Sequence, residues 1–301
     1  MNRIIGNIRG NEAGPLLILV AAVHGNERES LQAIENVFHK IHSSSIRIHG
    51  ELLAIYGNLS ALRRGERYID YDLNRCFTES QLNYLRSTRA RLSKAEDHEA
   101  HDLMRILDAY AAKKYKLKIL ADLHSTSAAQ GNFVIVPEYY ADHPLVTSLQ
   151  LPVITNLETF LRGTLSMYAC EEGFLGLAFE GGQIGSPEAV KLHEAGIWML
   201  LHKSGLVKDL SHTFVQDCSH LLERMSQQLP RKVKVNSMHV IREGSHFEMK
   251  PGYYNFKTVS RGETLAQDKN GDIVAPQDGM IFMPLYQKQG SDGFFIVEEV
   301  E

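Results

Sequence analysis

The feature that most constrains the fold is an uninterrupted apolar run, residues 15–23, that leads directly into His24-Gly25-Asn26-Glu27. Such a run is typical of a strand covered on both faces, as in the sheets of α/β proteins. Its nine residues fall well short of the roughly 20 that a membrane-spanning helix needs. The surrounding sequence also lacks the charged start and cleavage site of a signal peptide. We therefore expect a buried strand in a cytoplasmic protein without a membrane segment.

The charge balance argues against a nucleic-acid partner. The chain of 301 residues carries 32 Lys and Arg against 36 Asp and Glu, a formal net charge of −4, whereas proteins that bind polyanions are strongly basic. The three cysteines, Cys76, Cys170 and Cys218, are an odd number without zinc-ribbon spacing. We expect them to be small buried side chains in a reducing compartment. The sequence does not determine the oligomeric state, and a homo-oligomer is left open.

Alternating strand and helix patterns predict an α/β domain over residues 1–228, with a mixed, largely parallel sheet flanked by helices. The expected strands after the first are residues 51–56, 117–123, 132–136 and 175–179. The expected helices are residues 29–41, 80–112 and one that begins at Ser186-Pro187 and ends before Gly205. The arginine-rich segment 58–75 is predicted to be an ordered binding loop.

The pattern changes near Pro230, and residues 229–301 are predicted to form a small all-β domain. Helical spacing disappears there, and short alternating runs are separated by turn dipeptides such as Asn270-Gly271 and Asp278-Gly279. The chain therefore divides into a larger α/β domain and a smaller β-rich one.

The first candidate site residues are His24 and Glu27, after the first buried strand. One imidazole and one carboxylate at this spacing form a common half of a catalytic zinc site, which needs three protein ligands and an open position for water. The pair alone is a weak signal in a chain with 14 histidines. Asp122-Leu123-His124 ends another predicted strand, on which residues 122 and 124 share a face. Asp122 would then accept the second N–H of His124; a structural histidine capped by the following polar turn is the alternative.

Two further segments carry groups suited to binding and proton transfer. Residues 67–75 read Arg-Tyr-Ile-Asp-Tyr-Asp-Leu-Asn-Arg, and arginine forks match carboxylates in two parallel hydrogen bonds. A solvated basic loop is the alternative there. Glu180 closes an apolar strand ahead of Gly181 and Gly182, where partial desolvation would raise the pKa of its carboxyl group and suit a general base. The alternative is a carboxylate that caps the next helix.

Taken in order, these four motifs resemble those of the succinylglutamate desuccinylase/aspartoacylase family, which belongs to the zinc carboxypeptidase fold group. The likeness covers roughly residues 15–185 and the β-rich C-terminal region, and segment 67–75 is its most specific part. It implies a zinc-carboxypeptidase-like mixed sheet, one Zn²⁺ per chain and hydrolysis of the amide bond of an N-acyl amino acid.

The resemblance also implies the roles of the catalytic residues. His24, Glu27 and His124 match the zinc ligands of the family. Glu180 matches its catalytic glutamate, which activates the metal-bound water. Arg67 matches the arginine that polarises the scissile carbonyl and stabilises the oxyanion.

For the substrate, the resemblance implies that Asn74 and Arg75 bind the amino-acid carboxylate. The aspartoacylase branch adds an arginine and a tyrosine to the substrate pocket, and Arg162 and Tyr286 are the candidates here. The spacing of Arg162 departs from the aspartoacylase pattern, which argues against N-acetylaspartate itself as the substrate.

The leading hypothesis is therefore a zinc-dependent amidohydrolase that cleaves N-acyl amino acids of the succinylglutamate or acylaspartate kind. A zinc carboxypeptidase, or a cytoplasmic peptidase of peptidoglycan fragments, would use the same site. A third alternative is a non-catalytic module that binds a metal or a ligand. Glu180 argues against it, because binding alone needs no base.

Overall fold

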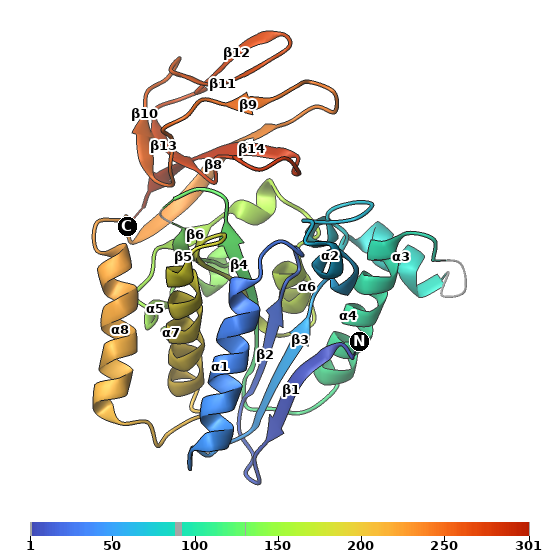
Figure 1. Cartoon of the computed structure of the whole chain (residues 1–301), viewed down its shortest axis with the longest axis vertical. Helices are drawn as coiled ribbons and strands as arrows, with labels where there is room; N and C mark the ends of the chain where they lie inside the picture. The colour runs from blue at the N-terminus through green and yellow to red at the C-terminus, as the bar shows by residue number, and fades with distance from the viewer. Residues whose placement is uncertain (1, 88–91, 130, 301) are drawn as a thin grey trace.

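The computed structural model describes residues 2–87, 92–129 and 131–300 of the chain. Within these ranges, eleven strands form one mixed sheet in the order β1-β3-β2-β4-β7-β5-β6-β8-β14-β13-β10, and three more form a second sheet. Helices flank the large sheet on both faces, and the smaller sheet lies at one end of the molecule (Figure 1). The predicted fold class, a mixed α/β sheet flanked by helices with a β-rich C-terminal part, is confirmed.

Four parallel strands at the centre of the large sheet carry the residues that define the site. In spatial order they are β3 (Glu51–Tyr56), β2 (Leu16–Ala21), β4 (Lys118–Thr126) and β7 (Leu175–Gln183). Every residue of β2 is buried, as expected of an apolar run between two helical layers. Strands β4 and β7 are longer than predicted, so His124 and Glu180 lie inside them at paired positions.

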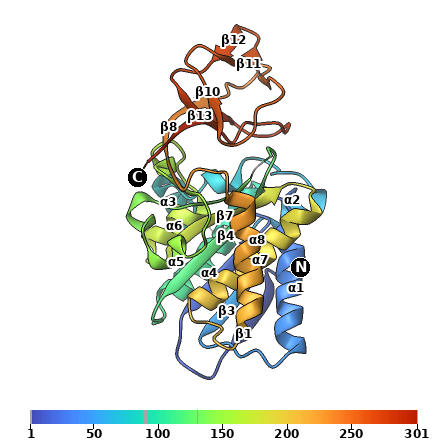
Figure 2. The same ribbon diagram turned by 90° about the vertical axis from the view of Figure 1, so that its left-hand side faces the viewer.

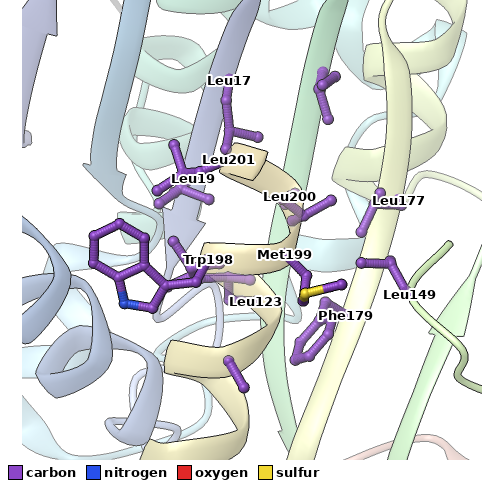
Figure 3. Close-up of a cluster of buried hydrophobic side chains, with 14 of the residues drawn as sticks. Leu17, Leu19, Leu123, Leu149, Leu177, Phe179, Trp198, Met199, Leu200 and Leu201 are labelled. Atoms are coloured by element: carbon purple, nitrogen blue, oxygen red, sulfur yellow. The ribbon is translucent and has the colours of Figure 1, made fainter. Parts of the chain in front are cut away.

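Two layers of helices bury the two faces of this sheet (Figure 1 and Figure 2). One layer contains α1 (Glu29–Ser43), α7 (Pro187–Lys203) and α8 (His212–Ser226), and the other contains α3 (Glu79–Ser87), α4 (Ala95–Ala111) and α6 (Leu165–Glu171). In the first layer, Trp198 and Leu200 of α7 belong to the same buried cluster as Leu19 of β2 and Leu177 of β7 (Figure 3). Alternate residues of each strand face opposite layers, which explains why the central strands are apolar throughout.

Two of the predicted local features differ from the structure. The single helix expected over residues 80–112 is wrong, because α3 and α4 are separate helices, and residues 88–91 lie outside the described residues. The loop expected over residues 58–75 is wrong in its first part, because Leu59–Arg64 forms helix α2. The side chain of Asn58 starts α2 by accepting the backbone N–H of Ala61.

The predicted start of a helix at Ser186 and the predicted burial of the three cysteines are confirmed. Helix α7 starts with the Ser186 hydroxyl accepting the backbone N–H of Glu188. The cysteines are buried and form no disulfide within the described residues, and burial raises the pKa of each thiol, so that each stays protonated. No helix in the described part of the chain is long and apolar enough to cross a bilayer.

Several short elements had no clear sequence signal, because they are too brief to show a period or lie outside the apolar runs. They are the strands β1 (Ile4–Arg9) and β6 (Val153–Thr155), helix α5 (Pro144–Thr147), and the 3-10 turns Leu73–Arg75, Glu138–Tyr140 and Leu157–Thr159. Strand β5 (Asn132–Ile135), which was expected, pairs antiparallel with β7.

The C-terminal part consists of strands alone within the described residues. Four of them extend the large sheet: β8 (Lys232–Val240), β14 (Asp292–Glu299), β13 (Gly279–Phe282) and β10 (Lys257–Val259). The second sheet contains β12 (Gly271–Val274), β11 (Thr264–Asp268) and β9 (Glu248–Met249). Because β8 pairs with β6, the hydrogen-bonded ladder runs unbroken from the α/β part into this one. A domain boundary at residue 228 stays a prediction.

The segment between β13 and β14 lies against the loops that follow the central strands. Asn26 donates to the side chain of Gln287 (3.2 Å), and the backbone N–H of Arg67 donates to Gln289 (3.0 Å). In Figure 1 the C-terminal strands accordingly lie beyond one end of the central strands. Residues from both ends of the sequence therefore surround one edge of the sheet.

A buried carboxylate holds the loop over residues 65–72 in place. Glu96, in the first turn of α4, is fully buried and accepts the backbone N–H groups of Ile69 (2.8 Å) and Asp70 (2.9 Å). It also accepts the side-chain amide of Asn58 (3.0 Å), at the start of α2. One side chain thus satisfies donors from two segments: the buried amide of Asn58 and the partly buried backbone N–H groups of Ile69 and Asp70.

We predict that Glu96→Ala destabilises the protein by several kcal/mol, because each buried donor left unpaired costs about 1–3 kcal/mol. Chemical denaturation followed by circular dichroism measures this change. The matched control is Asp102→Ala on the same helix, whose side chain is 52% exposed; its effect should stay within about 0.5 kcal/mol. Equal stability of the two variants would show that Glu96 does not anchor the loop.

Candidate metal and substrate site

Three buried side chains converge at the carboxyl ends of β2 and β4. His24 and Glu27 lie in the turn between β2 and α1, and His124 lies on β4. The Nδ1 atom of His24 is 2.8 Å from one carboxylate oxygen of Glu27, and the Nδ1 atom of His124 is 2.9 Å from the other. The three ligand atoms lie within 4.8 Å of one another. The side chains that the sequence proposed as metal ligands are thus brought together.

Gly25 lets the turn that carries these ligands pack against α2. A Cβ atom at this position would lie 2.2 Å from the backbone carbonyl carbon of Ala61, a distance that no side chain tolerates. The Gly25 N–H also donates to the carbonyl of Arg67 (3.2 Å). The His-Gly-Asn-Glu motif therefore needs its glycine for a close backbone approach.

Two further carboxylates hold the outer nitrogens of the imidazoles. Asp122 lies 2.9 Å from Nε2 of His124, as the sequence predicted, and Asp72 lies 3.1 Å from Nε2 of His24. Burial disfavours a charged His124, but the neighbouring carboxylates of Asp122 and Glu27 raise its pKa well above the usual value. The role of Asp72 was not predicted, although it lies inside the segment 67–75.

This donor set fits a divalent metal such as zinc. Histidines that bind a metal through one ring nitrogen commonly donate the other N–H to a carboxylate, which fixes the ring. In both imidazoles here Nδ1 faces Glu27 and Nε2 lies near an aspartate; Nε2 of His24 is within hydrogen-bond distance of Asp72, and Nε2 of His124 is 2.9 Å from Asp122. Two histidines and one glutamate make up a ligand set of catalytic zinc sites, which leave a position open for water.

Arg67 lies beside the ligands and stays charged. Its guanidinium contacts Asp72 at 3.1 Å and Glu27 at 3.4 Å. Burial opposes the charge, but these two carboxylates raise the pKa of Arg67 above its usual value. Its Nε atom is buried without a hydrogen-bond partner among the described residues. The Arg67 side chain nevertheless lines the space beside the ligands, where a bound molecule could contact its guanidinium.

Asn74 and Arg75 follow on a 3-10 turn next to the ligands. The Asn74 side chain accepts the backbone N–H of Leu165 (2.8 Å), and its amide nitrogen lies 3.3 Å from Nε2 of His124. Arg75 donates to the backbone carbonyl of Asn74 (2.6 Å) and forms an ion pair with Asp292 of β14. No sequence signal pointed to Asp292, because it comes from the C-terminal part, 217 residues further along the chain.

Glu180 faces the ligands from the neighbouring strand. It pairs with His124 across β4 and β7, and it is only 5% exposed. Burial is the main cause that raises the pKa of Glu180 to about 7, and the nearby Glu27 carboxylate raises it further. Its Oε2 atom is buried and has no hydrogen-bond partner among the described residues. Gly182 then bends the strand at a φ of 107°, a conformation that favours glycine.

Two cavities meet at these residues, and we name each after one residue of its wall. Both are lined by the same central group: His24, Arg67, Arg75, His124, Glu180 and Met283. The Asn74 cavity continues between β5, β7 and α6. The Gln287 cavity continues toward the C-terminal strands and includes Glu27 and Asp292. The central group therefore lies where a molecule could occupy both cavities at once.

The structure does not bring the other two predicted substrate residues to this place. Tyr286 is 41% exposed, and its hydroxyl donates to the carbonyl of Lys250 (2.8 Å) and accepts the N–H of Tyr253 (3.1 Å). Arg162 is exposed. Neither is among the described residues that line the two cavities.

Sequence analysis also missed His193 of α7. This histidine is fully buried, and its Nε2 lies 3.2 Å from the hydroxyl of Ser125, whose backbone N–H donates to Glu27 (3.1 Å). Burial lowers the pKa of His193 to about 3, so the ring is neutral. His193 therefore contacts Ser125, the residue whose backbone N–H holds the predicted ligand Glu27. No motif in the sequence around His193 indicates this role.

Comparison with known proteins identifies the family of the chain. The family model of the succinylglutamate desuccinylase/aspartoacylase catalytic domain matches residues 13–172, which are 160 of the 301 residues. The chain belongs to this family. The succinylglutamate desuccinylase of Pseudomonas aeruginosa (strain LESB58) is 29% identical over 118 residues, 39% of this chain and 33% of that protein. That of Pseudomonas fluorescens (strain SBW25) is 38% identical over 64 residues, 21% of this chain and 19% of that protein. The match spans at most about a third of the length of these relatives.

Solved structures of the family share the fold over nearly the whole chain. A succinylglutamate desuccinylase/aspartoacylase from Rhodobacter sphaeroides superposes with a TM-score of 0.69 at 16% identity, covering 98% of this chain and 88% of that one. A succinylglutamate desuccinylase from Vibrio parahaemolyticus superposes with a TM-score of 0.65 at 17% identity, covering 96% of this chain and 83% of that one. A product-bound ectoine utilization protein from Ruegeria pomeroyi superposes with a TM-score of 0.67 at 19% identity, covering 97% of this chain and 87% of that one. At these identities the likeness establishes the fold.

We predict that Asp122→Asn weakens zinc binding about 10- to 100-fold, because the amide no longer accepts the imidazole N–H as a carboxylate does. Competition with a chromogenic chelator measures the affinity, and circular dichroism checks the fold. Asp102→Asn, which makes the same change at an exposed position, is the matched control and should leave the affinity unchanged. Wild-type affinity in Asp122→Asn would mean that this contact does not orient a metal ligand.

Proposed function

We propose that the protein is a zinc-dependent amidohydrolase that cleaves an N-acyl amino acid into a carboxylate and a free amino acid. The observation that carries the proposal is the buried Glu180 carboxylate, with one unpaired oxygen, beside a His-Glu-His group that could hold a metal ion. A module that only binds a metal or ligand has no need of such a carboxylate. The names of the relatives, succinylglutamate desuccinylases, support the same reaction class.

A zinc ion held by His24, Glu27 and His124 would polarise the amide carbonyl and lower the pKa of a coordinated water. Glu180 then accepts the proton of the attacking water and returns it to the departing amine. Burial raises the pKa of Glu180, and a carboxyl group with a raised pKa is suited to accept a proton and return it. The balance is one water consumed, one C–N bond broken, and one carboxylate and one amine released.

Arg67 and the Asn74-Arg75 pair orient the substrate in this proposal. The guanidinium of Arg67, which lines both cavities, donates to the carbonyl oxygen as negative charge develops on it, a contribution typically of several kcal/mol. Asn74 and Arg75, which both line the Asn74 cavity, bind the carboxylate of the amino acid. Because Asp292 already pairs with Arg75, the substrate carboxylate shares or replaces that contact.

Glu180→Gln tests the proposal, because glutamine keeps the shape of the side chain and cannot accept the proton. We expect kcat on an N-acyl amino acid to fall about 10²- to 10⁴-fold. Zinc content, measured by elemental analysis, and the thermal midpoint should stay close to those of the wild type. The matched control is Glu171→Gln at an exposed position of α6, outside both cavities. Near-normal turnover in a zinc-loaded Glu180→Gln protein would overturn the assignment.

A further inference from the structure

The walls of the two cavities differ in chemistry. Beyond the central group, the Asn74 cavity is lined mainly by apolar side chains: Ile135, Val136, Leu157, Leu161, Met167 and Ala178. The Gln287 cavity is lined beyond that group largely by hydroxyl, amide and carboxylate groups: Ser125, Thr126, Ser127, Gln287 and Asp292. A molecule that spans the centre therefore meets an apolar wall on one side and a polar wall on the other.

The position of Asn74 decides which half of the substrate meets the apolar wall. Asn74 lines only the Asn74 cavity, whereas Arg75 lines both. If the pair binds the amino-acid carboxylate, the α-carbon lies at the mouth of the Asn74 cavity. The side chain of the same amino acid, one bond from that carbon, then extends into the cavity. The acyl group lies on the other side of the amide, in the Gln287 cavity.

The charges around the centre leave no cation for a second carboxylate. Among the described residues that line either cavity, the arginines and lysines are Arg67 and Arg75 alone. Arg67 already contacts Asp72 and Glu27, and Arg75 pairs with Asp292. A dicarboxylic amino acid would therefore place its side-chain carboxylate among mainly apolar side chains without a cation to pair with, which is unfavourable.

We infer that the amino acid released by this enzyme is neutral and apolar, of the size of leucine or methionine, rather than aspartate or glutamate. The inference rests on the proposed function and adds its substrate class. It differs from what the names of the relatives state, because those enzymes are named for succinylglutamate. The exposure of Arg162, away from both cavities, agrees with it.

One residue in the wall of the Asn74 cavity favours a different substrate class, the basic amino acids. Glu158 is partly exposed and lines the Asn74 cavity, together with the polar side chains of Thr164 and Ser166. Its carboxylate further disfavours an acidic side chain, but it would attract a basic one. We favour the neutral class because the apolar residues dominate the wall, and a basic substrate is one of the outcomes that the test distinguishes.

The test is kcat/KM of the zinc-loaded wild type on N-acetyl-leucine, N-acetyl-methionine, N-acetyl-aspartate, N-acetyl-glutamate, N-acetyl-lysine, N-succinyl-glutamate and N-octanoyl-aspartate. We expect the leucine and methionine derivatives to exceed all the others by about tenfold or more. A preference for the aspartate, glutamate or lysine derivatives overturns the inference. So does a preference for N-octanoyl-aspartate, which would put the acyl chain in the apolar cavity. Hydrolysis of none of the seven overturns the proposed function itself, and the inference with it.

A positive charge introduced into the wall of the Asn74 cavity tests the inferred substrate class independently. Met167 lies on α6 and is partly exposed, so that an arginine there can reach the cavity. We expect Met167→Arg to raise the ratio of kcat/KM for N-acetyl-glutamate over N-acetyl-methionine about tenfold or more. Met167→Leu and Glu171→Gln are the controls, the first for shape and the second for net charge on the same helix. Ile135→Arg makes the same test from β5 if Met167→Arg does not fold. An unchanged ratio in a folded variant would show that the side chain does not enter this cavity.

Discussion

One carboxylate between two imidazoles is the interaction on which the rest of the site depends. The two oxygens of Glu27, which is 3% exposed, face Nδ1 of His24 and Nδ1 of His124. A buried carboxylate is costly unless positive charge lies beside it, and a divalent cation bound among the three donors would supply that charge. Asp72 lies 3.1 Å from Nε2 of His24 and Asp122 lies 2.9 Å from Nε2 of His124, so each ring has a carboxylate on its outer side that favours this orientation. The remaining groups are arranged around this centre.

The sheet explains how residues far apart in sequence reach that centre. Strands β2, β4 and β7 are adjacent and parallel, so their carboxyl ends bring His24, His124 and Glu180 to one edge. Glu96 fixes the loop that carries Arg67 to the same edge. The C-terminal part of the chain lies against this edge of the sheet, and its Asp292 forms an ion pair with Arg75. Because Arg67 and Arg75 both have acidic partners within the protein, the charge left for a substrate is small, and this limits which substrates fit.

The parts of the site that could be predicted from sequence all lie next to strong local patterns. His24, His124 and Glu180 each follow or end an apolar run, and the segment 67–75 is distinctive by itself. Asp292, Glu96 and His193 could not be found in this way, because their contacts cross between distant elements and leave no local period. The single helix expected over residues 80–112 failed for a related reason: apolar spacing continues across the break between α3 and α4. Arg162 and Tyr286 were proposed from a loose resemblance, with no distinctive motif around either residue.

The most direct test of this account is the position of the metal itself. Crystals of the zinc-loaded protein, measured at the zinc absorption edge, give an anomalous difference map that locates each ion. The account predicts one peak per chain, about 2.0–2.2 Å from Nδ1 of His24, Nδ1 of His124 and the carboxylate of Glu27, with the next position open. A peak bound through the Nε2 atoms, a fourth protein ligand that closes the site, or zinc held elsewhere in the chain would contradict it.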